Sequence, residues 1–233
     1  MRVFDIQGLV DVWHMLRQNR PNRGRLLIIV TLVGYSAATM CLDTEGTILQ
    51  LFVTFPPLSW SVQQYGNFQT IQGIVMCIIL TAAIPVLKHV VKFKETTIGI
   101  IASVSAAGCA LCYSQAVYSW IMFLALGVGV FRPLMTIYLQ SALLGLVTQS
   151  ETGKMGSLVG IIQAVCLVLS SGAFVKVFGA TAAWWPGFIF AIQSVVLLLP
   201  LGAFCSTAYV YRRKTARRAS DKEAILDDNE IDV

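Results

Sequence analysis

Charged residues are scarce in this sequence. They make up 12% of the 233 residues, whereas an ordinary soluble domain carries about 25%. Hydrophobic residues make up 56%. The first 25 residues hold several arginines and no apolar run of the kind found in a cleavable signal peptide. This composition excludes an ordinary soluble domain and indicates an all-α integral membrane protein whose partner is the lipid bilayer.

The signatures of catalysis and of metal binding are missing as well. The sequence contains no HExxH, GxSxG or P-loop motif. Cys109 and Cys112 form a C-x-x-C, but they lie in an apolar segment without a nearby histidine or carboxylate, which favours helix packing over a metal or redox site. No filter loop or polar ring typical of a channel is present. We therefore expect no enzyme activity, no cofactor and no metal.

Six apolar segments are long enough to cross a bilayer, which takes about 20 helical residues. They cover residues 26–55, 68–91, 97–115, 118–147, 155–178 and 183–210. The first contains Asp43 and Glu45, so two interpretations compete. Either one long or broken helix includes both carboxylates, or a helix ends near Leu42 and they lie in an outer loop. Because residues 49–55 are too short to cross alone, we favour the long helix.

The ends of the chain differ from this bundle in composition. Residues 1–25 form a basic, amphipathic lead-in, and residues 211–233 form a tail that is first basic and then acidic, with the character of a disordered segment. Basic residues also follow the second and fourth apolar segments. The positive-inside rule then predicts a six-helix bundle over residues 26–210 with both termini in the cytosol. It also accounts for the net charge of +5, which does not indicate nucleic-acid binding.

Arg132 stands near the middle of the fourth segment and is followed at once by Pro133. A cation at the centre of a bilayer costs about 2.5–3.5 kcal/mol on insertion scales. Proline lacks the N–H that a helix needs, so we expect a kink at this point. An alternative is that Arg132 marks a helix end and extends to the lipid headgroups. Apolar sequence on both sides favours a buried charge with a functional role.

Asp43, Glu45 and Arg132 are therefore the ionisable residues expected inside the bilayer. A carboxylate there can take up a proton on one side and release it on the other when its surroundings alternate. We predict proton-coupled transport of a small organic anion, with Asp43 or Glu45 carrying the proton and Arg132 binding the substrate or that carboxylate. A static ion pair that fixes helix register is the competing interpretation. Candidate hydrogen-bonding partners of the substrate are Gln69, Gln72, Tyr138 and Gln140.

Short motifs in a fixed order suggest a family. They are FDIQGLVDV with RQNRPNRGRLLIIV near the start, PPLSWSVQQYG after the first segment, and SETGKMGSL after the fourth. With them the chain resembles the carboxy-terminal half of a major facilitator superfamily transporter, in particular the proton-coupled folate transporter family of solute carriers. In that register the family's histidine of the seventh span is Leu42 here and its arginine of the tenth is Gln140. Folate-specific roles therefore do not carry over residue by residue.

The resemblance implies one half of a twelve-helix fold in which the substrate lies between two six-helix halves. Met1 would then be an incidental start, and an amino-terminal six-helix half would be a partner. The function implied is uptake or organelle export of an organic anion, folate-like or other, at the plasma membrane or an endolysosomal membrane. The alternative is a non-transporting membrane subunit or scaffold that pairs with another membrane protein.

Overall fold

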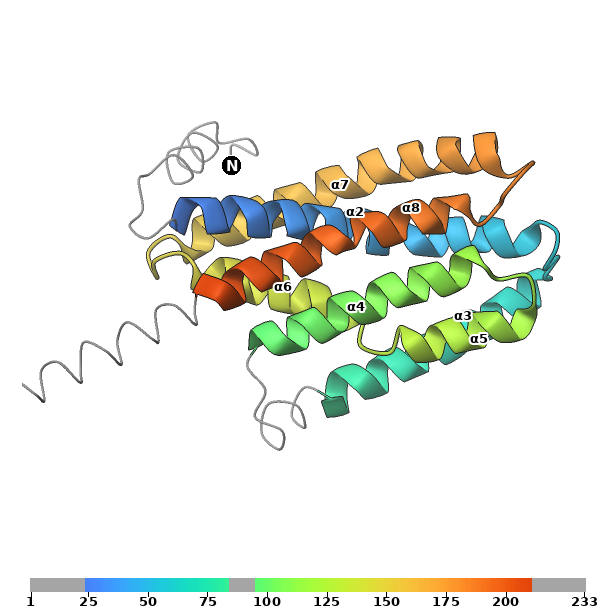
Figure 1. The fold of residues 1–233 in the computed structure, drawn as a ribbon, viewed down its shortest axis with the longest axis horizontal. Coiled ribbons are helices and arrows are strands. Elements are labelled where there is room, and N and C mark those ends of the chain that lie inside the picture. The colour runs from blue at the N-terminus through green and yellow to red at the C-terminus, as the bar shows by residue number, and fades with distance from the viewer. Residues whose placement is uncertain (1–23, 84–94, 211–233) are drawn as a thin grey trace, which may run out of the picture.

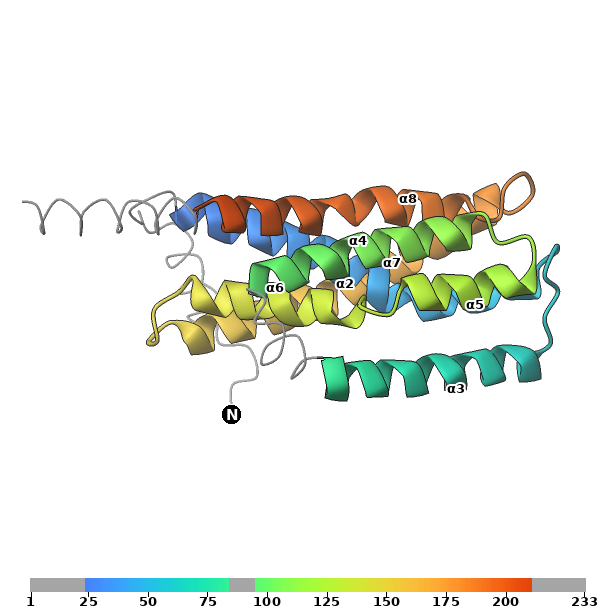
Figure 2. The same cartoon turned by 60° about the horizontal axis from the view of Figure 1, so that its bottom comes forward.

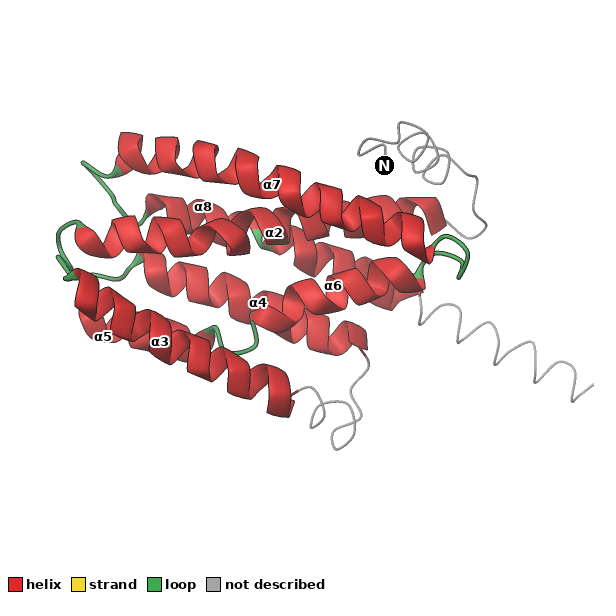
Figure 3. Cartoon of the chain, turned by 180° about the vertical axis from the view of Figure 1, so that it is seen from behind, coloured by secondary structure: helices red, strands yellow, loops and turns green. Residues whose placement is uncertain are grey.

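Helices running along one common axis make up the computed structural model, which describes residues 24–83 and 95–210 (Figure 1). The elements are α2 (Gly24–Thr54), α3 (Val62–Ile78), the π-helix η2 (Ile79–Ala83), α4 (Glu95–Ser114), α5 (Ser119–Val128), α6 (Pro133–Gly145), α7 (Thr152–Thr181) and α8 (Phe188–Val196). Every regular element in these ranges is a helix, as Figure 3 shows. Most of the expected lead-in and the whole tail lie outside the described residues.

Five helical stretches among the described residues are long and apolar enough to cross a membrane. They are Arg25–Thr54, Glu95–Ser114, Ser119–Gly145, Thr152–Thr181 and Phe188–Val210. The remaining expected segment starts as α3, continues as η2 and then leaves the described residues. The all-helical, multi-pass architecture predicted from the sequence is thus confirmed. The start of α2 and residue 210 lie at the same end of the bundle (Figure 1); which side of a membrane that end faces stays a prediction.

The first apolar segment forms one uninterrupted helix. α2 is 31 residues long, about 46 Å at 1.5 Å per residue. Asp43 and Glu45 lie within it, so the long helix is confirmed and the alternative with an outer loop is wrong. Buried hydroxyl groups do not break the helix because they bond to its own carbonyls; Thr31 and Thr39, for example, donate to Leu27 O and Tyr35 O.

Two clusters of buried side chains hold the bundle together. The first joins α2, α4, α6 and α7 with the stretch after α8, and includes Tyr35, Leu139 and Phe204. The second joins α2, α3, α4, α5, α7 and α8, and includes Phe52 and Phe190, whose rings meet edge to face at 5.2 Å. α5 contributes only to the second cluster and α6 mainly to the first, so the two clusters meet near the gap between these helices.

α4 is the interior helix that its small residues predicted, because most of its side chains are buried. Two glycines show how closely α4 and the last span approach. A Cβ on Gly99 would lie 2.2 Å from Phe204 Cε1, and a Cβ on Gly187 would lie 2.0 Å from the backbone oxygen of Ser114. By contrast, α3 lies along the edge of the bundle (Figure 2), and only Phe68 and Gln72 of this helix are buried.

Replacing Gly187 by alanine should therefore destabilise the bundle, since the new methyl group would collide with backbone that cannot rotate away. We expect Gly187→Ala to lower the free energy of unfolding by about 1–3 kcal/mol. Gly179→Ala is the matched control, because a Cβ at that position meets nothing within 4 Å. The measurement is the thermal midpoint of the detergent-solubilised protein by size-exclusion chromatography. Equal midpoints for both variants would contradict the contact.

Candidate functional site

The fourth span is broken in its middle. α5 ends at Val128 and α6 begins at Pro133, with residues 129–132 forming a turn between them. Pro133 stands at the first position of α6, where its missing N–H is tolerated and its fixed φ suits a helix start. A Cβ on Gly129 would lie 2.7 Å from Cys109 Sγ, so glycine lets the turn lie directly against α4. The predicted kink is thus confirmed as an interruption of the regular α-helix, which the chain crosses in a tight hydrogen-bonded turn.

Arg132 lies at this break with 6% of its surface exposed. Its Nη1 donates a hydrogen bond to Oε1 of Glu45, which is 8% exposed, and forms a salt bridge with it. The same Nη1 lies 3.8 Å from Cys109 Sγ. The expected burial of Arg132 is confirmed, and the alternative in which its side chain extends to the headgroups is wrong. Removing one partner would leave the other charge buried and unpaired.

Asp43 does not join this pair. It lies two residues before Glu45, about 200° around the helix, and its side chain is exposed. The side chain of Gln163 in α7 hydrogen-bonds to its carboxylate instead. Between the two acids, Thr44 donates a 2.7 Å hydrogen bond to Ser170 Oγ of α7, where both hydroxyl groups are buried. α2 therefore presents Glu45 to the helix break and Asp43 toward α7.

Gln69 of α3 is a predicted substrate-binding residue that is linked by hydrogen bonds to α2 next to Glu45. Its Nε2 donates to Tyr65 Oη at 2.8 Å, and Tyr65 Oη donates to the carbonyl of Gly46 at 2.8 Å. Gly46 directly follows Glu45, so this chain of hydrogen bonds ties α3 to α2 beside the acid. Gln72 lies one turn further along α3 and is buried.

The other two predicted residues lie on α6, away from the break. Tyr138 and Gln140 are about 9 Å and 12 Å beyond Arg132 along the helix axis. Tyr138 is buried in the first core cluster, and Gln140 is exposed. The structure therefore does not bring either side chain to the ion pair.

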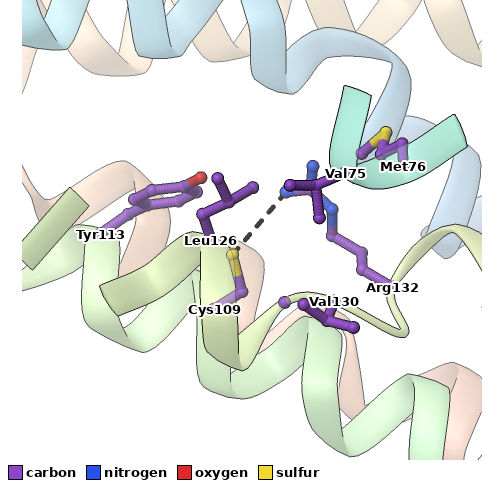
Figure 4. A pocket seen from close by; sticks show the side chains of 8 residues that line it. Val75, Met76, Cys109, Tyr113, Leu126, Val130 and Arg132 are labelled. Carbon is purple, nitrogen blue, oxygen red and sulfur yellow. Dashed lines mark hydrogen bonds between the residues drawn. The ribbon is translucent and has the colours of Figure 1, made fainter. Parts of the chain in front are cut away.

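Two residues that the sequence did not single out as functional lie beside Arg132. Cys109 and Tyr113, one turn apart on α4, line a small cavity together with Arg132 (Figure 4). The cavity has room for about one water molecule. Its remaining walls come from α3, α5 and the turn, and are formed by Val75, Met76, Leu126, Gly129 and Val130. Only the four-residue spacing of Cys109 and Tyr113 in α4 could have indicated a shared face.

Among known proteins the chain has relatives in solute carrier family 46. It is 22% identical over 195 residues to the probable peptidoglycan muropeptide transporter SLC46 of Drosophila melanogaster, an alignment that covers 82% of the chain and 37% of the relative. It is 26% identical over 192 residues to the lysosomal proton-coupled steroid conjugate and bile acid symporter SLC46A3 of Gallus gallus. That alignment covers 82% of the chain and 41% of the relative. It is 26% identical over 179 residues to solute carrier family 46 member 2 of Canis lupus familiaris. That alignment covers 75% of the chain and 37% of the relative.

These relatives confirm the resemblance to a family of solute carriers that the motifs suggested, and one of them, SLC46A3, is named a proton-coupled symporter. Two of the three are named as a transporter or a symporter, and the third as a solute carrier. The chain spans about two-fifths of the length of the curated relatives it matches. No family model matches the chain.

The burial of the ion pair predicts a strong energetic coupling between its members. Arg132→Met and Glu45→Leu should each lower the free energy of unfolding by about 3–5 kcal/mol, because each leaves an unpaired buried charge. The double variant should recover most of that loss, since no charge then remains. Thermal midpoints of the detergent-solubilised variants measure this, with Lys176→Met at an exposed position of α7 as the control for loss of a cation. A double variant no more stable than either single variant would contradict the pairing.

Proposed function

We propose that this chain forms the carboxy-terminal half of a proton-coupled symporter of organic anions. The observation that carries the proposal is the buried pair of Arg132 and Glu45 at the break of a membrane-crossing helix. Within an apolar bundle, ionisable side chains mark ion or substrate pathways more often than they stabilise the fold. The relatives named as a proton-coupled steroid conjugate and bile acid symporter support the same function.

In this mechanism Glu45 and the substrate compete for one cation. When Glu45 takes up a proton it loses its charge, and the Arg132 guanidinium then needs another negative partner. An organic anion supplies that partner, so substrate binding is favoured when Glu45 is protonated. On the other side of the membrane the anion leaves, Glu45 releases its proton, and the salt bridge forms again. Because each buried charge is costly when unpaired, the proton and the anion move together.

The neighbouring polar residues take supporting roles in the proposal. Gln69 and Gln72 on α3 offer hydrogen bonds to the substrate from the side of α2 that holds Glu45. Asp43 remains a second candidate for proton uptake on the side of α2 that faces α7. Tyr138 and Gln140 would contact only a part of the substrate that extends along α6.

Transport by alternating access also needs a second half, because the substrate pathway of this architecture lies between two six-helix units. We infer that an amino-terminal half supplies the other wall, and that the membrane is the plasma membrane or an endolysosomal one. A static ion pair in a non-transporting subunit is the second candidate, and it is favoured by the direct contact between Arg132 and Glu45.

Uptake of a radiolabelled steroid sulfate at pH 5.5 and 7.5 distinguishes the two candidates. The chain is expressed in cells alone and with the amino-terminal half of a relative. We expect faster uptake at pH 5.5, which Arg132→Ala lowers at least about tenfold because the anion loses its cation. Glu45→Gln, which stays uncharged at both pH values, should retain uptake but lose its pH dependence.

Lys176→Ala is the control for removing a cation, and it should leave both the rate and its pH dependence unchanged. Acid-stimulated uptake that survives Arg132→Ala would overturn the mechanism. If the protein reaches the membrane but neither combination takes up the anion, the non-transporting subunit is the better description.

A further inference from the structure

The hydroxyl group of Tyr113 is fully buried and makes no hydrogen bond of ordinary geometry among the described residues, although the weakly hydrogen-bonding thiol of Cys109 lies beside it. The whole residue is 1% exposed. A buried phenolic hydroxyl ordinarily finds a partner, and leaving it without one costs free energy. An unpartnered group of this kind in a packed interior calls for an explanation, and a partner from outside the chain is one.

The tyrosine ring is held in place by its packing. The ring packs on Phe190 of α8 with centroids 5.5 Å apart, and it belongs to the second core cluster. In Figure 4 the hydroxyl points along the cavity toward the side where the Arg132 guanidinium lies, with Cys109 and Leu126 between them. Tyr113 and Arg132 therefore face the same small cavity from opposite ends.

The polar groups around this cavity are mainly donors. The guanidinium of Arg132 can only donate hydrogen bonds, the Tyr113 hydroxyl has a free proton to donate, and the Cys109 thiol is a weak donor. The other lining side chains are apolar. An atom that fits this cavity must accept hydrogen bonds from several sides, and the positive charge of Arg132 favours one that carries negative charge. An oxygen of a carboxylate or sulfate group meets both conditions.

We propose that Tyr113 is a substrate-binding residue, whose hydroxyl donates a hydrogen bond to an oxygen of the anionic group that Arg132 binds. This inference rests on the proposed function and adds α4 to the helices that contact the substrate. The cavity has room for about one oxygen atom, so it accepts the head of the anion and leaves the organic part outside. α3, which forms one wall with Val75 and Met76, buries few of its residues and is the wall that can yield.

Equilibrium binding tests the inference separately from transport. The full chain, purified in lipid nanodiscs, is titrated at pH 5.5 with a radiolabelled steroid sulfate and with the same steroid lacking the sulfate group. We expect Tyr113→Phe to weaken binding of the sulfate about tenfold, because a hydrogen bond to a charged group is lost. Binding of the uncharged steroid should not change.

Two further measurements separate binding from structure. Without ligand, Tyr113→Phe should melt at or above the midpoint of the parent protein, because the hydroxyl that it removes has at most the weak Cys109 thiol as a partner among the described residues. Tyr35→Phe alters a buried tyrosine of the first core cluster and should bind the sulfate as the parent protein does.

Unchanged sulfate binding by Tyr113→Phe, or no sulfate binding by the parent protein, would overturn the inference. A lower melting midpoint without ligand would also overturn it, since the hydroxyl would then have a structural role. Sulfate binding that depends on Tyr113 without any acid-stimulated uptake would support this inference and count against symport.

Discussion

The buried positive charge of Arg132 is the constraint on which the rest of this bundle depends. A guanidinium in an apolar interior needs a negative partner, and three features of the chain provide one. Pro133 breaks the fourth span so that the side chain leaves the turn rather than a helix face. Gly129 lets that turn lie against α4. α2 continues unbroken past the same level and delivers Glu45.

The residues on either side of Glu45 connect it to different helices. Thr44 bonds to Ser170 of α7, and the carbonyl of Gly46 accepts a hydrogen bond from Tyr65 of α3. A shift of α3 or α7 relative to α2 would therefore act on α2 within one residue of the acid. The ion pair also lies where the two core clusters meet. Its geometry can thus respond to rearrangement of either cluster, which a pair deep within one cluster could not do.

Much of this arrangement could be predicted from the sequence because it follows from hydropathy and from one proline. The apolar segments, the long first helix, the break at Pro133 and the burial of Arg132 all have local causes. The helical period also distinguishes the two acids, because it places them on different faces of α2. Glu45 shares a face with Cys41, Ile48 and Phe52, which are all buried, whereas Asp43 lies on the opposite side.

Contacts between helices were not predictable in the same way. Tyr138 and Gln140 are polar residues in the same apolar segment as Arg132, but α6 carries them away from the break. Tyr113 has no distinguishing neighbours in the sequence. Its importance comes from the approach of the turn and α3 to α4, which closes a cavity around its hydroxyl. Such an approach depends on tertiary packing, which hydropathy and motif spacing do not describe.

The strength of the salt bridge sets a limit on any transport mechanism that uses it. A ligand shifts an equilibrium only by the difference in its affinity for the two states. If the pair of Arg132 and Glu45 were fully isolated from other polar groups, an arriving anion would have to replace the whole interaction alone. In our proposal Tyr113 changes this balance. Its hydroxyl makes no hydrogen bond of ordinary geometry among the described residues while Glu45 is paired, and it would gain one from the anion. In the mechanism we propose, this hydroxyl favours exchange of Glu45 for the substrate, which is the step that joins the proton to the anion.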